Sequence, residues 1–230
     1  MHTKHVLVLN LLFEQSLKKS FDQRIAEVFE TIDIKYDTIH LSNLADSHNL
    51  NDYTHLLISG STESAMEECS WYPRLDAIID HFMSKNKSIL GICFGHQFLV
   101  RHIIGKNHVR KSSTPEIGWT NIKLSDNQIF HTVGSLKSAV FHYDEVFDLD
   151  DRFEITATSD RCTIHGFQVR GEKIWGVQFH PDFTYYDVFE FTEDIRKKDP
   201  LFEEIHCRTD VSPDEFKQND LILKNWIQLS

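Results

Sequence analysis

Apolar and polar residues follow two different rhythms in the first half of the chain. Short apolar runs, typical of buried strands, stand at 5–10, 55–60 and 88–93, and the segment at 34–41 also has the pattern of a strand. Residues 16–32 and 74–84 instead carry apolar side chains at helical spacing, and the stretch directly after the run at 88–93 has helical character as well. This alternation predicts an α/β fold with a mostly parallel central sheet and helices on both of its faces.

The second half of the chain has a different pattern. From about residue 107 to residue 180 it consists mostly of short strand-like runs such as "IGWTNIKL", "AVFHY" and "FEITATS". Such a cluster predicts a smaller antiparallel extension of the sheet. Residues 186–197 then have helical spacing.

The C-terminal segment carries a helix-start signal. Ser212 can cap a helix, Pro213 suits its first position, and Glu215 completes a capping box. We therefore expect a helix at about 212–229 that packs on the rest of the chain. No repeat, low-complexity stretch or linker interrupts the sequence, so we expect residues 1–230 to form a single domain.

Composition and charge exclude several classes of protein. The chain has a net charge of −11 and no long basic run, which argues against nucleic acid as a partner. No stretch is apolar enough to span a bilayer, no signal peptide is recognisable, and the four cysteines form no CxxC pair. We expect a soluble, cytoplasmic protein that binds no membrane, no metal and no other cofactor.

One cysteine stands between two glycines at the end of a predicted strand. Gly91, Cys93 and Gly95 form the pattern G-x-C-x-G, the cysteine form of the nucleophile elbow, a sharp strand-to-helix turn. The N-terminus of the following helix favours a thiolate at Cys93, and the N–H of Phe94 faces the place where an oxyanion develops. A small apolar cysteine buried at a strand end fits the same pattern, so this motif alone leaves both interpretations open.

A second motif supplies a base and a carboxylate. "IWGVQFHPD" at 174–182 is a predicted strand with His180 at its C-terminal end and Asp182 two positions later. Residues two apart in an extended segment point to the same side, so Asp182 can orient the imidazole while His180 activates Cys93. Taken alone, His180 is simply a polar residue at a strand end, and it is Cys93 that favours the catalytic interpretation.

A turn after the predicted strand at 55–60 offers further hydrogen-bond donors. The strand ends in Gly60, which the small residue Ser61 follows. Accessible backbone N–H groups in such a turn can complete an oxyanion hole. An ordinary turn has the same composition, so this interpretation depends on the other two motifs.

Together these motifs resemble those of the class I glutamine amidotransferases. The family hallmarks G-x-C-x-G-[HQ]-Q and G-V-Q-F-H-P-E correspond to "GICFGHQ" at 91–97 and "GVQFHPD" at 176–182, in the expected order. "EIGW" at 116–119 is similar to a stretch of stand-alone members. The resemblance extends over roughly residues 5–195 and implies a flavodoxin-like α/β domain.

The resemblance also implies a chemistry. Family members attack the side-chain amide of glutamine with a thiolate, form a γ-glutamyl thioester and release ammonia, after which water frees glutamate. Carried over by position, Cys93 is the nucleophile, His180 the general base and acid, and Asp182 the orienting carboxylate. The implied oxyanion-hole residues are Gly60, Ser61 and Phe94.

Three further positions are candidates for substrate contacts. Gln97, on the first turn after the elbow, is similar to a substrate-contact position of the family. Glu116 can line the cleft. His142 can approach the site, because stand-alone members often have a histidine-rich strand there. For His142, a place on a surface strand is the simpler alternative.

The sequence departs from the family pattern at two positions. Asp182 stands where the family usually has Glu, which shortens the side chain by one methylene, or roughly 1.5 Å. Ser61 stands where many members have a second glycine, and a serine there would be strained if the position required positive φ. Both departures concern activity more than fold.

Three functions fit these features. The first is a glutaminase-type amidotransferase that supplies ammonia to a separate synthase chain, because this chain has no phosphate loop and no dinucleotide fingerprint of its own. The second is a γ-glutamyl peptidase or hydrolase with the same thioester chemistry. The third is a catalytically silent binding or regulatory protein, against which intact Cys93 and His180 argue. A small-molecule glutamine or γ-glutamyl substrate is expected in the first two cases.

Overall fold

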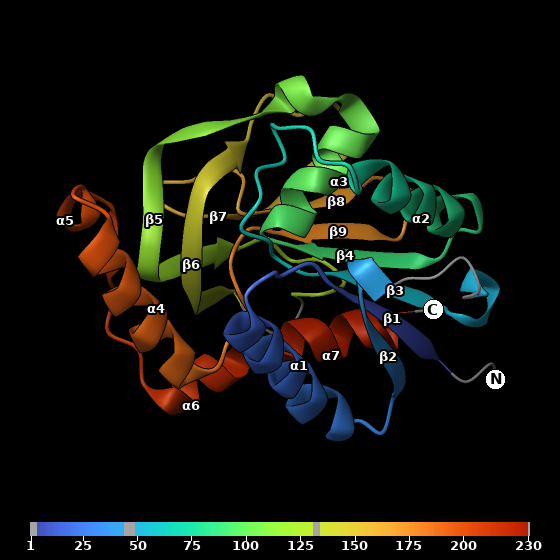
Figure 1. The fold of residues 1–230 in the computed structure, drawn as a ribbon, viewed down its shortest axis with the longest axis horizontal. Coiled ribbons are helices and arrows are strands. Elements are labelled where there is room, and N and C mark those ends of the chain that lie inside the picture. Colours follow the sequence, from blue (N-terminus) through green and yellow to red (C-terminus); the bar gives the residue numbers. More distant parts are fainter. Residues whose placement is uncertain (1–3, 44–48, 131–133, 230) are drawn as a thin grey trace.

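The computed structural model of the chain describes residues 4–43, 49–130 and 134–229. One part of its sheet is parallel and consists of β1 (His5–Asn10), β2 (Lys35–His40), β3 (His55–Ile58), β4 (Ser88–Ile92) and β9 (Ile174–Val177). Their spatial order, β2-β1-β3-β4-β9, is the flavodoxin-like order of a doubly wound sheet. The alternating elements of the first half thus form the predicted parallel sheet (Figure 1).

The remaining strands extend this sheet on the β9 side. They are β8 (Gly166–Val169), β7 (Phe153–Thr158), β5 (Val109–Leu124), β6 (Ser135–Val146) and β10 (His206–Arg208). All pairings from β9 to β6 are antiparallel, and β10 alone is parallel to β5. The predicted antiparallel extension is confirmed. β5 is longer than the predicted run at 117–124 because its first residues also pair with β6, across a register shift.

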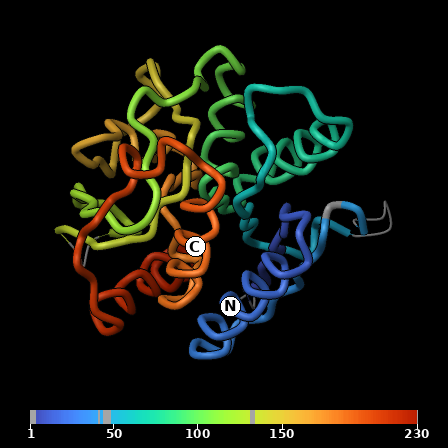
Figure 2. Tube along the Cα trace, turned by 60° about the vertical axis from the view of Figure 1, so that its left-hand side comes forward, coloured from blue at the N-terminus to red at the C-terminus, as the bar shows by residue number. Residues whose placement is uncertain are grey.

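Helices cover both faces of the parallel part. They are α1 (Gln15–Glu30), α2 (Tyr72–Ser84), α3 (Phe94–Ile104) and α7 (Asp220–Gln228). Successive strand residues point to opposite faces, so Leu7 and Leu9 pack with α2 and α3, whereas Val6 and Val8 pack with α1 and α7. Figure 1 shows these two helical layers, and Figure 2 shows α2 and α3 again on the side opposite α1.

The C-terminal part differs from the single helix predicted at 212–229. After α4 (Tyr185–Lys198) and α5 (Phe202–Ile205), it forms α6 (Pro213–Phe216), a 3-10 turn (Lys217–Asn219) and then α7. Ser212 and Glu215 do form the predicted capping box. The buried Asn219 lies at the break, where its amide donates to the carbonyls of Lys137 and Phe216 and accepts from Ser138. This tertiary polar contact leaves no trace in the hydrophobic pattern.

The register of the parallel strands determines which residues meet at their C-terminal edge. Ile58 of β3 pairs with Gly91 of β4, which in turn pairs with Gly176 of β9. The three strands therefore end almost level. In open α/β sheets this edge is where ligands bind, and here it brings together the turns that follow β3, β4 and β9.

Candidate active site

Cys93 occupies a strained turn between β4 and α3. Its backbone has φ 51° and ψ −102°, in a region that residues with a side chain rarely adopt. An added Cβ at Gly91 would lie 2.5 Å from the Gly95 carbonyl, and one at Gly95 would lie 2.5 Å from the carbonyl oxygen of Ile58. The two glycines are thus required because the strand and the helix approach closely at the turn. Together these features form the predicted elbow.

His180 follows β9 and lies near Cys93. Its N–H donates to the carbonyl of Ala139 in β6 at 2.9 Å, which anchors the backbone of the turn. A Cβ placed on Gly60 would lie 3.3 Å from Cε1 of His180 and 3.7 Å from Cβ of Cys93. Gly60 therefore sits against both side chains, and any larger residue there would crowd them.

Asp182 reaches the imidazole despite its shorter side chain. Nδ1 of His180 donates to Oδ1 of Asp182 at 3.0 Å, and both residues are buried. The ring of Phe183 stacks on the imidazole, with centroids 4.2 Å apart and planes 18° from parallel. Nε2 of His180 is buried and faces the side chain of Cys93, where it can exchange a proton with a bound molecule.

The charges around His180 favour its protonated form. Burial by itself lowers the pKa of this imidazole, but the carboxylate of Asp182 and the side chain of Cys93 together outweigh that effect and raise the pKa to about 10. The arrangement thus places a protonated imidazole, a proton donor, beside the side chain of Cys93.

The candidate oxyanion donors lie around Cys93. Phe94 is the first residue of α3, where a backbone N–H has no acceptor within the helix. The hydroxyl of Ser61 donates to the carbonyl of Leu11 at 3.1 Å. Ser61 is not among the described non-glycine residues with positive φ, so the strain considered for a serine at this position does not arise.

Two clefts meet at Cys93. The first, called the α4 cleft, has a volume of about 300 Å³ and is lined by residues of α1 and α4 together with His180 and Asp182. The second, called the α3 cleft, has a volume of about 330 Å³ and is lined by Phe94 and Gln97 of α3 and by residues 141–144 of β6. Both include Ser61 and Cys93 in their walls. A molecule bound across the sulfur can therefore extend in two directions.

Polar groups converge on the α3 cleft. The amide of Gln97 donates to the carbonyl oxygen of Asp144 and to the side chain of Gln178, both at 2.9 Å. Asp144 is 9% exposed and pairs with the exposed Lys111 at 2.6 Å, and it also accepts from the Ser64 hydroxyl at 2.5 Å. The cleft thus offers one carboxylate and one ammonium group side by side.

Of the three predicted substrate contacts, Glu116 is the one that lies away from both clefts. Gln97 and His142 line the α3 cleft, whereas Glu116 is fully buried behind it. Oε2 of Glu116 accepts from Nε2 of His142 at 3.1 Å and from Nε2 of His165 at 2.6 Å. Burial favours the neutral acid, but these hydrogen bonds dominate and hold the pKa of Glu116 well below its usual range.

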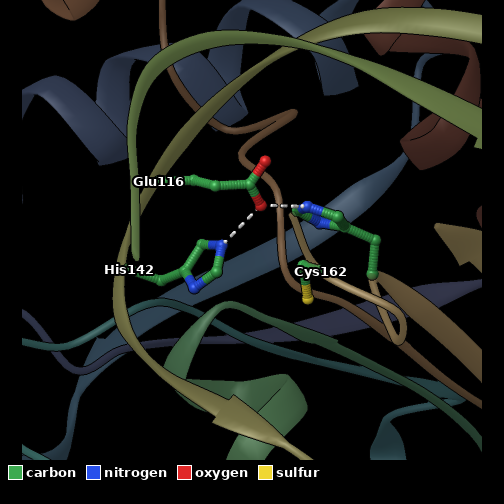
Figure 3. Close-up of side chains that lie close together, drawn as sticks. Glu116, His142 and Cys162 are labelled. Carbon is green, nitrogen blue, oxygen red and sulfur yellow. Dashed lines mark hydrogen bonds and ion pairs between the residues drawn. The ribbon is translucent and has the colours of Figure 1, made fainter. Parts of the chain in front are cut away.

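Cys162 completes this buried cluster, as Figure 3 shows. The ligand atoms of Glu116, His142, Cys162 and His165 all lie within 4.8 Å of one another, so these residues could hold a metal ion. Burial raises the pKa of the Cys162 thiol to about 12, which keeps it protonated. The sequence offered no signal for this cluster, because its members lie on strands and loops that only the folded sheet brings together.

Two further findings concern membrane-spanning helices and the cysteines. Within the described residues, no helix is both long and apolar enough to cross a membrane. All four cysteines are free thiols, and Cys69 is the only one of them that is not buried.

The chain is similar to several known proteins. A family model described as "Glutamine amidotransferase class-I" matches residues 13–187. A GMP synthase (glutamine-hydrolyzing) subunit of Thermoplasma acidophilum is 31% identical over 153 residues, which are 65% of this chain and 73% of that protein. Gamma-glutamyl peptidase 2 of Arabidopsis thaliana is 28% identical over 189 residues, which are 78% of this chain and 75% of that protein.

The fold agrees as well. A glutamine amidotransferase from Thermotoga maritima, known from its crystal structure, superposes with a TM-score of 0.76 at 19% identity and covers 100% of both chains. The family model extends over the turns after β3, β4 and β9, which carry Gly60, Cys93 and His180. The chain belongs to the class I glutamine amidotransferase family.

Proposed function

We propose that this chain hydrolyses the γ-amide bond of glutamine or of a γ-glutamyl compound through a thioester on Cys93. The observation that carries the proposal is the position of Cys93. It stands in a strained elbow where two clefts meet, beside a His180 imidazole whose pKa is raised to about 10. A buried cysteine with a purely structural role needs neither the strain nor the charged partner.

The first step forms the thioester. The Cys93 thiolate attacks the γ-carbonyl carbon, and the N–H groups of Phe94 and of the turn at Gly60 and Ser61 stabilise the oxyanion. The C–N bond then breaks, and the proton of the His180 imidazolium goes to the nitrogen, which leaves as ammonia or as an amine. Asp182 keeps Nε2 of the imidazole directed at that nitrogen through its 3.0 Å hydrogen bond to Nδ1.

The second step frees glutamate. The neutral His180 takes a proton from water, and the resulting hydroxide attacks the thioester carbonyl. The C–S bond breaks, which regenerates the thiolate and the imidazolium. The same imidazole thus serves as acid in the first step and as base in the second.

The α3 cleft is suited to the α-amino-acid end of the γ-glutamyl group. That end carries an ammonium and a carboxylate, and the cleft offers Asp144 and Lys111, which pair with each other at 2.6 Å. A zwitterion can replace this internal pair with two pairs of its own. Gln97 fixes the wall of the cleft by donating to the carbonyl oxygen of Asp144, and His142 lies in the same wall.

The fate of the leaving group separates two candidate functions. As a glutaminase, the chain would pass ammonia to a separate synthase chain, and the relative named as a GMP synthase subunit supports that proposal. As a γ-glutamyl peptidase, it would release an amine, and the relative named gamma-glutamyl peptidase supports that alternative. The second cleft beside Cys93 favours the alternative, because ammonia needs no such space.

The test is release of glutamate from L-glutamine and from γ-glutamyl peptides by the purified chain. We expect turnover of at least one of them, and we expect Cys93→Ala to abolish it, while Cys69→Ala, which changes a thiol outside the site, retains it. Mass spectrometry of acid-quenched reactions should find the γ-glutamyl adduct on the peptide that contains Cys93. Turnover by Cys93→Ala at the wild-type rate would refute the proposal.

A further inference from the structure

The α4 cleft lies on the imidazole side of Cys93. His180 and Asp182 line this cleft and not the other, whereas Phe94, Gln97 and Asp144 line only the α3 cleft. The sulfur is thus flanked by the proton donor on one side and by the zwitterion-binding groups on the other. This asymmetry assigns the two halves of a γ-glutamyl substrate to different clefts.

The leaving group must enter the α4 cleft. The nitrogen that departs takes its proton from Nε2 of His180, which is buried beside the side chain of Cys93. Whatever that nitrogen carries must therefore extend past the imidazole, away from the glutamyl half. With glutamine as substrate the group is only ammonia, which leaves nearly all of the cleft's volume of about 300 Å³ empty.

The walls of this cleft are largely apolar. They include the half-buried side chains of Leu17 from α1, Phe191 and Ile195 from α4, and Phe183 from the turn before α4. The rim carries the exposed side chains of Glu14, Asp194 and Lys198, so charges of both signs are present there. Partly exposed apolar walls with a polar rim are typical of sites that bind an apolar group.

We propose that the α4 cleft is a leaving-group subsite and that the substrate is a γ-glutamyl amide of an amine with an aromatic or branched aliphatic group. This inference rests on the proposed Cys93 chemistry and adds the class of amine to it. The acyl half occupies the α3 cleft, the C–N bond lies over the sulfur, and the apolar group of the amine packs between α1 and α4. His180 donates its proton to the nitrogen, and the free amine leaves through the same cleft.

Two matched amides test this subsite. γ-Glutamyl methylamide and γ-glutamyl benzylamide share the acyl half and the bond that breaks, and they differ in the size of the apolar group. We expect kcat/KM to be about tenfold or more higher for the benzylamide, the discrimination that an apolar pocket achieves between groups of different size. Equal kcat/KM for the two amides would overturn the inference and leave the proposed chemistry intact, as expected if the cleft instead receives a synthase chain.

Variants of the walls sharpen the test. Leu17→Gln and Phe191→Gln each place a polar side chain in the cleft, and glutamine is an acceptable helix residue. Both should reduce the ratio of kcat/KM between benzylamide and methylamide toward one. Phe189→Gln is the control, because Phe189 is 49% exposed on the same helix α4 and lines neither cleft. A ratio unchanged by either wall variant would contradict the assignment.

A binding measurement separates this inference from the proposed function. The affinities of both amides for the Cys93→Ala protein, measured by calorimetry, do not depend on turnover. If the wild type hydrolyses no γ-glutamyl compound, the proposed function is refuted. The affinities of the two amides then test by themselves whether the α4 cleft binds the apolar group. Tighter binding of the benzylamide, lost in Cys93→Ala/Leu17→Gln, would support it, and equal affinities would refute it.

Discussion

The two parts of the sheet place their polar groups in opposite ways. In the parallel part, β3, β4 and β9 are buried along their whole length, and Cys93 and His180 come only after the strands end. In the antiparallel part, Glu116 and His142 lie inside β5 and β6 and are buried together with His165. A polar group at a strand end can face a cleft and react, whereas one in a strand interior must find its partners within the protein.

Cys93→Ala tests the parallel part of the sheet and should have the largest effect on activity. We expect kcat to fall by about 10⁵-fold, because removal of a nucleophile abolishes the covalent route. The urea midpoint should fall little, since the sulfur borders two clefts and the glycines of the turn stay in place. A large loss of stability would instead mean that the main role of Cys93 is to stabilise the hydrophobic core.

Asp182→Asn should lower kcat less, by about 10³-fold, because an orienting group matters less than the nucleophile. It should also move the alkaline limb of the pH profile. In the wild type, activity should fall as pH rises through about 10, where the His180 imidazolium loses the proton that the leaving nitrogen needs. Without the Asp182 charge the pKa of His180 falls, so the limb should move to lower pH. An unmoved limb would mean that another group controls the proton.

Glu116→Gln tests the antiparallel side. It removes a buried charge that accepts hydrogen bonds from His142 and His165, and loss of one partner from such a cluster costs about 3 kcal/mol. The free energy of unfolding in urea should fall by that amount. Glu154→Gln is the control, because Glu154 lies in the same part of the sheet but is 47% exposed and pairs only with Arg170 among the described residues. Equal losses of unfolding free energy in both variants would show that the buried cluster stabilises the protein no more than the exposed ion pair does.

Phe183→Leu should have the smallest effect. It removes the ring stacked 4.2 Å from the imidazole but keeps an apolar side chain of similar size. We expect kcat to fall about threefold, consistent with an aromatic contact worth about 0.5–1 kcal/mol. KM for a small amide should change little, so kcat and KM measured separately distinguish a positioning role from a loss of substrate binding.

Much of the parallel half could be predicted from sequence because its signals are local. The elbow at Cys93 and the pair His180 and Asp182 each lie within one short stretch, and apolar runs identify the strands that carry them. Glu116 shows where such reasoning fails. We expect it near the substrate, but it is fully buried and lines neither cleft, because the pairing of β5 with β6 places it against His142, a contact that no local pattern reveals.

The sequence by itself determined the parallel α/β core, the strained turn at Cys93 and the residues that follow β9, because each depends on neighbours only a few positions away. The tertiary structure alone decided that His180 and Cys93 meet beside Gly60 and that His165 meets Glu116 across 49 positions. It also decided that α1 and α4 enclose a second cleft beside the sulfur. These outcomes depend on distances between segments far apart in the chain, and such distances are set by strand register and helix packing.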